Sequence, residues 1–357
     1  MNERAAPVRT VVIGDGFIAA GFYQKAFERL DGERLTEVTV VDWPGTKAYH
    51  HEAQQVMEVQ GANAVEAPPE LLAAVREAEA VCLHFAPVNA DVLAAAAPHL
   101  RLVSIARTGL ENVDVEEATR RGVAVVPAFG RNAGAVAELQ IGLMLAETRN
   151  IARADASVKA GGWRKDFPGA RVELAHSTIA MVGFGHVGRV FAERVGGFGG
   201  RLVAYDPYTS DEALAPLRVE RAASLEELFA QADFVVVQTR HTAETDRFIG
   251  RDLLKLMKPS AYFINVSRSR VVDQRALFDV LRDGAISGAG LDVFDDEPLP
   301  VDSPWRELDN VTITTHFGGD TEGTNRASAQ LVAEAVLEYA RTGRVARAAN
   351  AEALGWR

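Results

Sequence analysis

Short apolar runs alternate along the chain with longer segments in which apolar residues recur every three or four positions. Runs of the first kind predict buried β-strands, and segments of the second kind predict amphipathic helices. Candidate strands in the N-terminal part lie at residues 10–13, 38–41, 80–85, 102–105 and 123–126. Those in the C-terminal part lie at residues 178–182, 202–205, 234–237, 262–266, 288–293 and 311–314. Strands that alternate with helices are joined by right-handed crossovers, so the pattern predicts parallel sheets in an α/β fold.

Two long helical patterns stand apart from this alternation. One extends from about residue 133 to residue 158, between the two groups of strands, and the other from residue 328 to residue 341. A chain of 357 residues is long for a single α/β domain. We therefore expect two doubly wound domains, with the first long helix bridging them.

Composition and charge narrow the class of protein. Hydrophobic residues make up 48% of the chain, so each domain can bury a core of its own. Cys82 is the only cysteine, which excludes a disulfide framework and fits a reducing compartment. A net charge of −11 disfavours a nucleic-acid partner, because phosphate binding needs a positive surface. No stretch is apolar and long enough to cross a membrane, and residues 1–10 lack a signal-peptide pattern, so we expect a cytoplasmic protein without a membrane partner.

Residues 178–206 combine a strand, a glycine-rich turn, a helix, a second strand and an acidic residue. Gly183 permits a tight turn, Gly185 permits close approach of a pyrophosphate, and Gly188 lets helix and strand pack closely. The N-terminus of the helix offers free N–H groups to the phosphates. Asp206, 18 residues after Gly188, is placed to accept hydrogen bonds from the adenosine ribose and to repel a 2′-phosphate. The segment predicts a dinucleotide site that favours NAD over NADP.

A similar turn near the N-terminus is a weaker candidate. Gly14, Gly16 and Ala19 match the tolerated form of the motif, and Asp42 ends the next strand. However, Trp43 and Pro44 follow this acid directly, and the candidate catalytic residues come after the second turn. We interpret the N-terminal turn as the first strand-to-helix connection of the other α/β domain.

Three polar motifs come at or beside strand ends in the C-terminal half, where parallel sheets bind ligands. They contain Arg268, Asp292 with Glu297, and His316. Taken singly, each is as readily a solvated strand end, a surface loop or a structural histidine. Together, an arginine, a carboxylate and a histidine are the groups needed to oxidise a 2-hydroxy acid with a nicotinamide cofactor. The guanidinium can hold the substrate carboxylate, the imidazole can take and return the hydroxyl proton, and the carboxylate can orient the imidazole.

With these motifs the chain resembles the D-isomer-specific 2-hydroxyacid dehydrogenase family, which includes phosphoglycerate, glycerate/glyoxylate, formate and D-lactate dehydrogenases. The resemblance covers residues 80–330 and is specific as a set. It rests on GFGHVG with Asp206, TAET at 242–245, INVSRSRVVDQRAL at 264–277, GLDVFDDEPLP at 290–300, HFGG at 316–319 and the segment 109–139. Glu297 follows Arg268 by 29 residues, as in the family, and His316 follows Glu297 by 19, a shorter interval than in some members.

The resemblance implies roles for individual residues. Arg268 would bind the substrate carboxylate and carbonyl, Glu297 would support the histidine, and His316 would be the acid/base, with no metal. Asp292 would hydrogen-bond the nicotinamide carboxamide. The other cofactor contacts would come from the turn glycines, His186, Val187, Thr239, Thr245, Val266, Ser267, Gly318 and Gly319, the last two at a hinge.

The resemblance also implies a domain organisation. Residues 133–321 would form a Rossmann NAD-binding domain, in which 133–160 serve as interdomain helix and dimer arm. Residues 1–132, completed by residues 322–357, would form a flavodoxin-like substrate (catalytic) domain. The implied protein is an NAD-dependent homodimer that interconverts a D-2-hydroxy acid and its 2-oxo acid.

The expected substrate loops depart from the common pattern. Arg107 stands near the position where many members have a glycine that approaches the substrate carboxylate, beside Thr108 and Gly109. Arg131 and His84 each follow a predicted strand and are further substrate candidates. The two arginines resemble those of a subgroup linked to sugar-acid-like substrates, and would recognise a phosphate, a second carboxylate or a polyol end. The structural alternative is ion pairing with Glu111, Glu116 or Glu138.

Two further positions depart from the family pattern. Ser269 replaces the glycine that usually follows the catalytic arginine, and Thr315 replaces the proline that usually precedes the histidine. Neither removes a catalytic group, but both weaken any transfer of substrate identity.

An NAD(H)-sensing regulator of the same fold is an alternative function, because such relatives can retain Arg268, Glu297 and His316. A dehydrogenase for an unusual donor such as phosphite is another.

Overall fold

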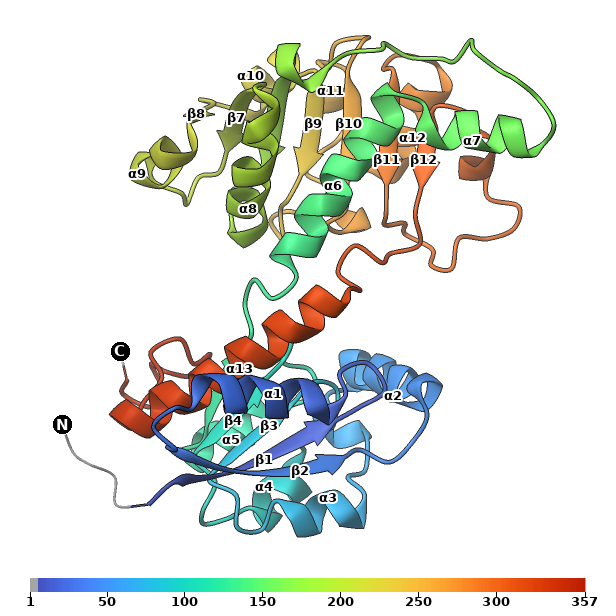
Figure 1. Ribbon diagram of the computed structural model, residues 1–357. Coiled ribbons are helices and arrows are strands. Elements are labelled where there is room, and N and C mark those ends of the chain that lie inside the picture. The colour runs from blue at the N-terminus through green and yellow to red at the C-terminus, as the bar shows by residue number, and fades with distance from the viewer. Residues whose placement is uncertain (1–5, 357) are drawn as a thin grey trace. The chain divides into compact units, whose positions relative to one another are not determined.

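The computed structural model describes residues 6–356 and divides into two compact units (Figure 1). Unit 1 contains the chain up to Arg131 and from Glu322 onward, and unit 2 extends from Asn132 to Thr321. Each unit has one parallel sheet with a hydrophobic core on both of its faces, which confirms the predicted α/β class with two doubly wound sheets. No helix within the described range is long and apolar enough to span a membrane.

The sheet of unit 1 has five parallel strands in the order β2-β1-β3-β4-β5. Its three consecutive strands β3, β4 and β5 are wholly buried, as is typical of parallel strands covered on both faces. The order reverses between β1 and β3, and ligands of open parallel sheets bind at such a switch point. The strands are β1 (Val8–Gly14), β2 (Thr36–Asp42), β3 (Ala80–Leu83), β4 (Leu102–Ile105) and β5 (Ala124–Pro127).

Helices from the two ends of the chain cover one face of this sheet. They are α1 (Ala20–Leu30) and α13 (Glu322–Thr342), which pack together and share one hydrophobic core with the strands. The opposite face is covered by α2 (Lys47–Gln60), a 3-10 turn η1 (Ala62–Ala64), α3 (Pro69–Ala74), α4 (Ala90–Ala95) and α5 (Val115–Arg120). The C-terminal segment therefore belongs to unit 1, although it is distant in sequence from the strands.

The sheet of unit 2 has seven parallel strands in the order β12-β11-β10-β9-β6-β7-β8. Its order reverses between β6 and β9, so the turn after β6 lies at the switch point. The strands are β6 (Thr178–Val182), β7 (Arg201–Tyr205), β8 (Val219–Arg221), β9 (Phe234–Val237), β10 (Tyr262–Asn265), β11 (Gly288–Leu291) and β12 (Val311–Ile313).

Two sets of helices cover the faces of this second sheet. The core on one face contains residues of α6 (Ala133–Thr148), η2 (Leu174–His176), α8 (His186–Val195) and α9 (Asp211–Leu214), beside η3 (Gly196–Phe198) and η4 (Ala215–Leu217). The core on the other contains residues of α10 (Leu225–Gln231), α11 (Arg251–Leu254), η5 (Ser269–Val271), α12 (Gln274–Arg282) and η6 (Pro304–Glu307). A further helix, α7 (Ile151–Lys159), buries none of its residues.

The predicted strands all occur, with ends shifted by a few residues, but three details differ from the sequence-based expectation. The short edge strand β8 was not predicted, because two of its three residues are exposed and it forms no apolar run. The expected single helix over residues 133–158 is wrong: it breaks into α6 and α7, since Asn150 adopts a left-handed conformation with φ of 54°. The C-terminal helix begins at Glu322, six residues earlier than expected.

Candidate active site

The glycine-rich turn connects β6 to α8 at the switch point of unit 2. Gly183 has a φ of +95°, which favours glycine, and a Cβ there would lie 3.0 Å from the Thr239 hydroxyl oxygen. A Cβ on Gly188 would lie 2.8 Å from Oε1 of Gln238 and 3.2 Å from the Phe184 ring, so a side chain there would displace the Gln238 amide. At Gly185, by contrast, no atom lies within 4 Å of the ideal Cβ position. The turn is therefore tightly packed behind the first and third glycines and open in front of the second.

Helix α8 begins at His186 with an uncapped N-terminus. Gly185 is its N-cap residue, and no side chain accepts a hydrogen bond from the first turn. The backbone N–H groups of His186 and Val187 have no partner within the helix, because the first turn of any helix leaves them free. These donors directly follow Gly185 in the chain and carry the positive end of the helix dipole, so they fit an anionic pyrophosphate.

Asp206 lies directly after β7 and beside the same turn. Its Oδ2 accepts a hydrogen bond from the backbone N–H of Phe184 at 2.7 Å, and its Oδ1 accepts one from the N–H of Tyr208 at 2.8 Å. These bonds fix the carboxylate next to the glycine turn. Each oxygen has a second lone pair, which leaves acceptors for a ribose diol. The turn, the helix N-terminus and the acid together fit a dinucleotide.

The other predicted cofactor residues lie in loops after neighbouring strands. Thr239 follows β9 and donates a hydrogen bond to the Val182 carbonyl at 2.9 Å, directly under the glycine turn. Thr245 is more remote and closes a local turn by donating to the Arg240 carbonyl at 2.7 Å. Val266 and Ser267 follow β10, where Val266 is buried. Of these residues, Thr239 has the most direct contact with the turn.

His316 and Glu297 form a close pair in unit 2. Nδ1 of His316 lies 2.6 Å from Oε2 of Glu297, and Oε1 of the same carboxylate accepts a hydrogen bond from the Phe294 backbone N–H at 2.8 Å. His316 has a φ of 56°, an unusual conformation for a residue other than glycine. With Nδ1 bound to the carboxylate, Nε2 is the ring nitrogen left to face a ligand.

Asp292 anchors the loop that carries this histidine. It is buried after β11, and its Oδ1 accepts hydrogen bonds from the Thr314 hydroxyl at 2.6 Å and the Phe317 N–H at 3.2 Å. Its Oδ2 accepts one from the Gly318 N–H at 3.0 Å. The expected role toward the nicotinamide is thus accompanied by a positioning role within the protein.

Small residues let the histidine loop pack closely on its neighbours. A Cβ on Gly318 would lie 2.6 Å from the side chain of Val266, in the loop after β10. A Cβ on Gly319 would lie 2.9 Å from Nδ2 of Asn132, at the beginning of unit 2. The histidine loop and the arginine loop are therefore in contact at the carboxyl edge of the sheet.

Arg268 has an exposed guanidinium in the loop after β10. Its Nη1 donates a hydrogen bond to the Ser267 carbonyl at 2.8 Å, and among the described residues no carboxylate forms an ion pair with it. An arginine that keeps its charge uncompensated is suited to bind an anionic ligand in a bidentate geometry.

The predicted substrate residues belong to unit 1. His84 is buried after β3, and its Nδ1 lies 3.3 Å from Oδ2 of Asp15. Nη2 of Arg107 forms ion pairs with Glu111 at 3.3 Å and with Glu58 at 3.0 Å. Glu111 is one of the partners named in the structural alternative. Arg131 donates a hydrogen bond to the Ser328 hydroxyl at 3.3 Å. In the same loop as Arg107, Thr108 is exposed and Gly109 half-buried, and the structure places Glu111 against that glycine.

Comparison with known proteins identifies the family. Residues 141–318 match the family model described as D-isomer specific 2-hydroxyacid dehydrogenase, NAD binding domain. A glyoxylate reductase from Thermococcus litoralis is 38% identical over 284 residues, which cover 77% of this chain and 85% of the reductase. The chain belongs to this family. The residues matched by the NAD-binding domain model all lie within unit 2.

Other relatives differ in length or only share the fold. A D-3-phosphoglycerate dehydrogenase from Methanocaldococcus jannaschii is 37% identical over 301 residues, 83% of this chain and 57% of that protein. The chain thus spans about half the length of the phosphoglycerate dehydrogenases it matches. The TT0316 protein from Thermus thermophilus is 31% identical, with a TM-score of 0.66 over 94% of this chain and 97% of that one. An NAD-complexed D-isomer specific 2-hydroxyacid dehydrogenase from Lactobacillus delbrueckii shows the same fold. It is 22% identical, with a TM-score of 0.75 over 95% of this chain and 98% of that one.

The sequence motifs did not single out one residue of the candidate site. Asn265 is buried at the end of β10, and its Oδ1 accepts hydrogen bonds from the N–H of Ser267 at 3.0 Å and from its hydroxyl at 2.8 Å. Its Nδ2 donates to the Arg268 carbonyl at 3.1 Å. The side chain therefore fixes the backbone that presents the arginine. A polar amide at the end of an apolar strand was the available signal.

Replacing Asp206 should change the cofactor preference of the protein. Asp206→Asn keeps an acceptor near the Phe184 and Tyr208 N–H groups but removes the charge that repels a 2′-phosphate. We expect the ratio of kcat/KM with NADPH to that with NADH to rise by about tenfold or more, the effect of roughly 1.4 kcal/mol of like-charge repulsion. Asp206→Ala should relax the preference too. It should also weaken NADH binding, because the glycine turn loses the hydrogen bond that the Phe184 N–H donates to Asp206. Unchanged discrimination in both variants would show that Asp206 does not contact the ribose.

Proposed function

We propose that the protein is an NAD-dependent oxidoreductase that interconverts a D-2-hydroxy acid and its 2-oxo acid. The observation that carries this proposal is the 2.6 Å pair between His316 and Glu297, in a loop that packs against the one presenting Arg268. Unit 2, which contains the dinucleotide turn, therefore also contains the acid/base His316, the orienting carboxylate of Glu297 and the anion-binding Arg268. D stereochemistry rests on family membership.

The residues divide the chemistry between them. Arg268 holds the substrate carboxylate in a bidentate pair and polarises the 2-oxo group. Nε2 of His316 gives its proton to the oxo oxygen in reduction and takes it back from the hydroxyl in oxidation. Glu297 at Nδ1 holds the ring and stabilises the imidazolium. Bound NADH supplies the hydride that C2 receives.

The test follows NADH consumption over a panel of 2-oxo acids. The panel contains glyoxylate, pyruvate, hydroxypyruvate, 2-oxoglutarate and larger phosphorylated or sugar-derived acids, each repeated with NADPH. Turnover of one group with NADH supports the proposal. Silence across the panel, with NADH binding shown separately by fluorescence, overturns it in favour of an NAD(H)-sensing role.

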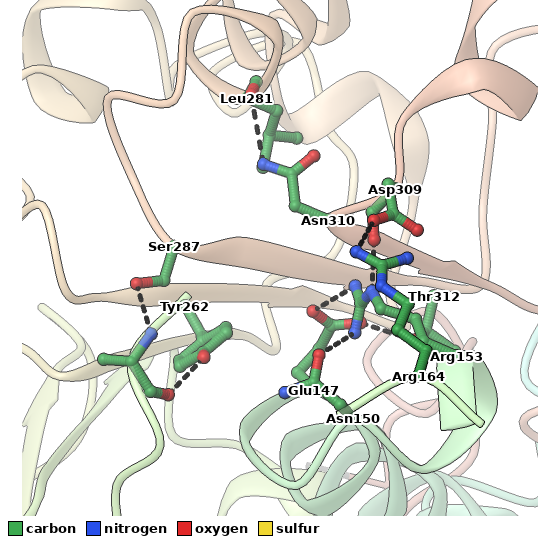
Figure 2. Close-up of polar contacts among 11 residues, drawn as sticks. Glu147, Asn150, Arg153, Arg164, Tyr262, Leu281, Ser287, Asp309, Asn310 and Thr312 are labelled. Atoms are coloured by element: carbon green, nitrogen blue, oxygen red, sulfur yellow. Dashed lines mark hydrogen bonds and ion pairs between the residues drawn. The ribbon is translucent and has the colours of Figure 1, made fainter. Parts of the chain in front are cut away.

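We further propose that the protein is a homodimer in which α7 and the following loop supply the contact. The helix buries none of its residues, and it exposes Ile151 and Val158 while Trp163 beyond it is 77% exposed. The half-buried Arg153 ties this helix to the body of unit 2 through an ion pair with the buried Glu147 (Figure 2). Sedimentation should give a dimer for the parent protein and a monomer after Trp163→Glu with Ile151→Glu; a monomeric parent would refute the assignment.

A further inference from the structure

Five polar residues gather at the carboxyl edge of the unit 1 sheet, where its strand order reverses. Asp15 follows β1, His84 follows β3, Arg107 and Glu111 follow β4, and Glu58 lies near the end of α2. We call them the switch-point cluster. Ion-pair contacts link Asp15 to His84 and join Arg107 to both Glu58 and Glu111. The ring of Phe85 joins the two groups, because it stacks on His84 and lies under the Arg107 guanidinium.

Two buried side chains of the cluster have polar atoms without a hydrogen-bond partner in the described part of the chain. These are Nη1 of Arg107 and both ring nitrogens of His84, of which Nδ1 has only the longer contact with Asp15. Arg107 is 9% exposed and His84 is 3% exposed. An unpaired buried polar atom destabilises the folded protein, so each of these atoms requires an explanation. A ligand that offers an acceptor to Arg107 and a donor to His84 supplies one.

His84 is a hydrogen-bond acceptor toward such a ligand. Burial lowers the pKa of its imidazole below the ordinary value, outweighing the opposite effect of Asp15. For Asp15, burial raises the pKa, but the contact with His84 and backbone N–H donors leave it below its usual range, so this carboxylate is ionised. The neutral ring has one N–H, and the carboxylate at Nδ1 favours the proton there. Nε2 then accepts a hydrogen bond, which a hydroxyl can donate and a phosphate dianion cannot.

The charge on Arg107 is already matched within the cluster. Glu58 and Glu111 both contact its Nη2, while its buried Nη1 has no hydrogen-bond partner among the described residues. Nearby cations do not create an excess of positive charge. Lys47 lies 4.7 Å from the Phe17 ring, and Arg131 acts electrostatically on His84. Together with Arg107 they make three cations, which the three carboxylates of the cluster balance. Since like charges placed together repel each other, a phosphate beside these glutamates is disfavoured.

Aromatic rings complete the surroundings of the two unpaired groups. The Phe85 ring stacks on His84 with centroids 3.7 Å apart, and the Phe17 ring meets Phe85 edge-on at 5.0 Å. The Arg107 guanidinium lies 5.1 Å from the Phe85 centroid. Apolar walls with a few oriented donors and acceptors are typical of small-molecule sites. The C–H groups of a polyol chain can pack on such rings while its hydroxyls meet Arg107, His84 and the glutamates.

We propose that the switch-point cluster binds the hydroxyl-bearing end of an unphosphorylated sugar acid and disfavours its phosphate ester. This inference rests on the proposed function and specifies the substrate class. Hydroxyls both donate and accept, as the cluster requires, whereas a phosphate dianion only accepts.

The first experiment compares matched substrates of the intact protein. We expect kcat/KM with NADH to be at least about tenfold higher for hydroxypyruvate than for its phosphate ester, and likewise for a 2-oxo sugar acid against its phosphorylated form. Hydroxypyruvate should also exceed pyruvate by roughly tenfold or more, because pyruvate leaves the buried groups unpaired.

The second experiment removes the two carboxylates that oppose an anion. Glu58→Gln with Glu111→Gln should lower the preference for the hydroxylated over the phosphorylated acid by about tenfold or more. Glu52→Gln is the matched control: Glu52 is an exposed glutamate on the same helix α2, and the substitution should leave the preference unchanged. NADH affinity and the melting temperature establish that the variants are folded.

The outcomes separate the two proposals. A parent protein that prefers the phosphate ester, or that reduces pyruvate as well as hydroxypyruvate, overturns the inference and leaves the dehydrogenase function standing. An unchanged preference in the folded double variant overturns it as well. A protein that binds NADH but reduces none of these acids refutes the proposed function itself.

Discussion

Replacing His316 with alanine should lower turnover by about 10²–10⁴ while NADH binds as before. The imidazole is the group that transfers the substrate proton in the proposed reaction, and Glu297 holds it through Nδ1. The dinucleotide turn and Asp206 lie in other loops of the sheet and do not depend on this side chain. The loss should therefore fall on kcat and kcat/KM rather than on the dissociation constant of NADH.

A matched control distinguishes loss of the acid/base from a general effect of removing a histidine. His176→Ala removes an exposed histidine of the same unit whose contact with Glu173 is 3.9 Å long, and it should leave turnover intact. Turnover and NADH binding are measured on the same preparations. Turnover of His316→Ala within threefold of the parent, roughly 0.7 kcal/mol, would rule out the assigned role. So would loss of NADH binding in the folded variant.

Periodicity sufficed for most of the fold because parallel strands buried on both faces form continuous apolar runs. The segment Phe234–Val237 is such a run and is a fully buried strand. It did not suffice for β8, whose Glu220 and Arg221 are exposed at the edge of the sheet. Nor did it predict the break at Asn150, because apolar residues continue on both sides and only the local φ separates the helices.

The site could be predicted only as far as motifs specify single residues. The spacing of Arg268, Glu297 and His316 drew attention to all three, and the structure adds that Glu297 contacts His316. Spacing does not show that Asp292 accepts three hydrogen bonds from the histidine loop, since that requires the contact of two strand ends. Similarly, Glu111 was a foreseeable partner of Arg107, but Glu58 lies 49 residues away and is brought there by α2.

Arg153→Ala should lower the free energy of unfolding by about 3–5 kcal/mol. Glu147 is 1% exposed, and Nη2 of Arg153 lies 3.1 Å and 2.9 Å from its two oxygens (Figure 2). Burial raises the pKa of Glu147, and the arginine and the Thr312 hydroxyl offset only part of that effect. Without Arg153 the carboxylate is left buried with no compensating cation and keeps the hydrogen bond from Thr312. Denaturant unfolding of parent and variant at pH 8 measures the difference.

The pH dependence and a neighbouring arginine distinguish this cause from simple loss of packing. Because the folded-state pKa of Glu147 lies above that of the unfolded chain, about 4.3, the folded protein takes up the proton first as the pH falls. The deficit of Arg153→Ala should therefore be largest at high pH and shrink toward pH 5, and adding Glu147→Gln should recover part of it. Arg164→Ala breaks the exposed pair with Asp309 in the same region and should cost much less, because solvent screens both charges (Figure 2). Equal losses for the two arginines, or a deficit independent of pH, would mean that the buried charge of Glu147 is not what Arg153 compensates.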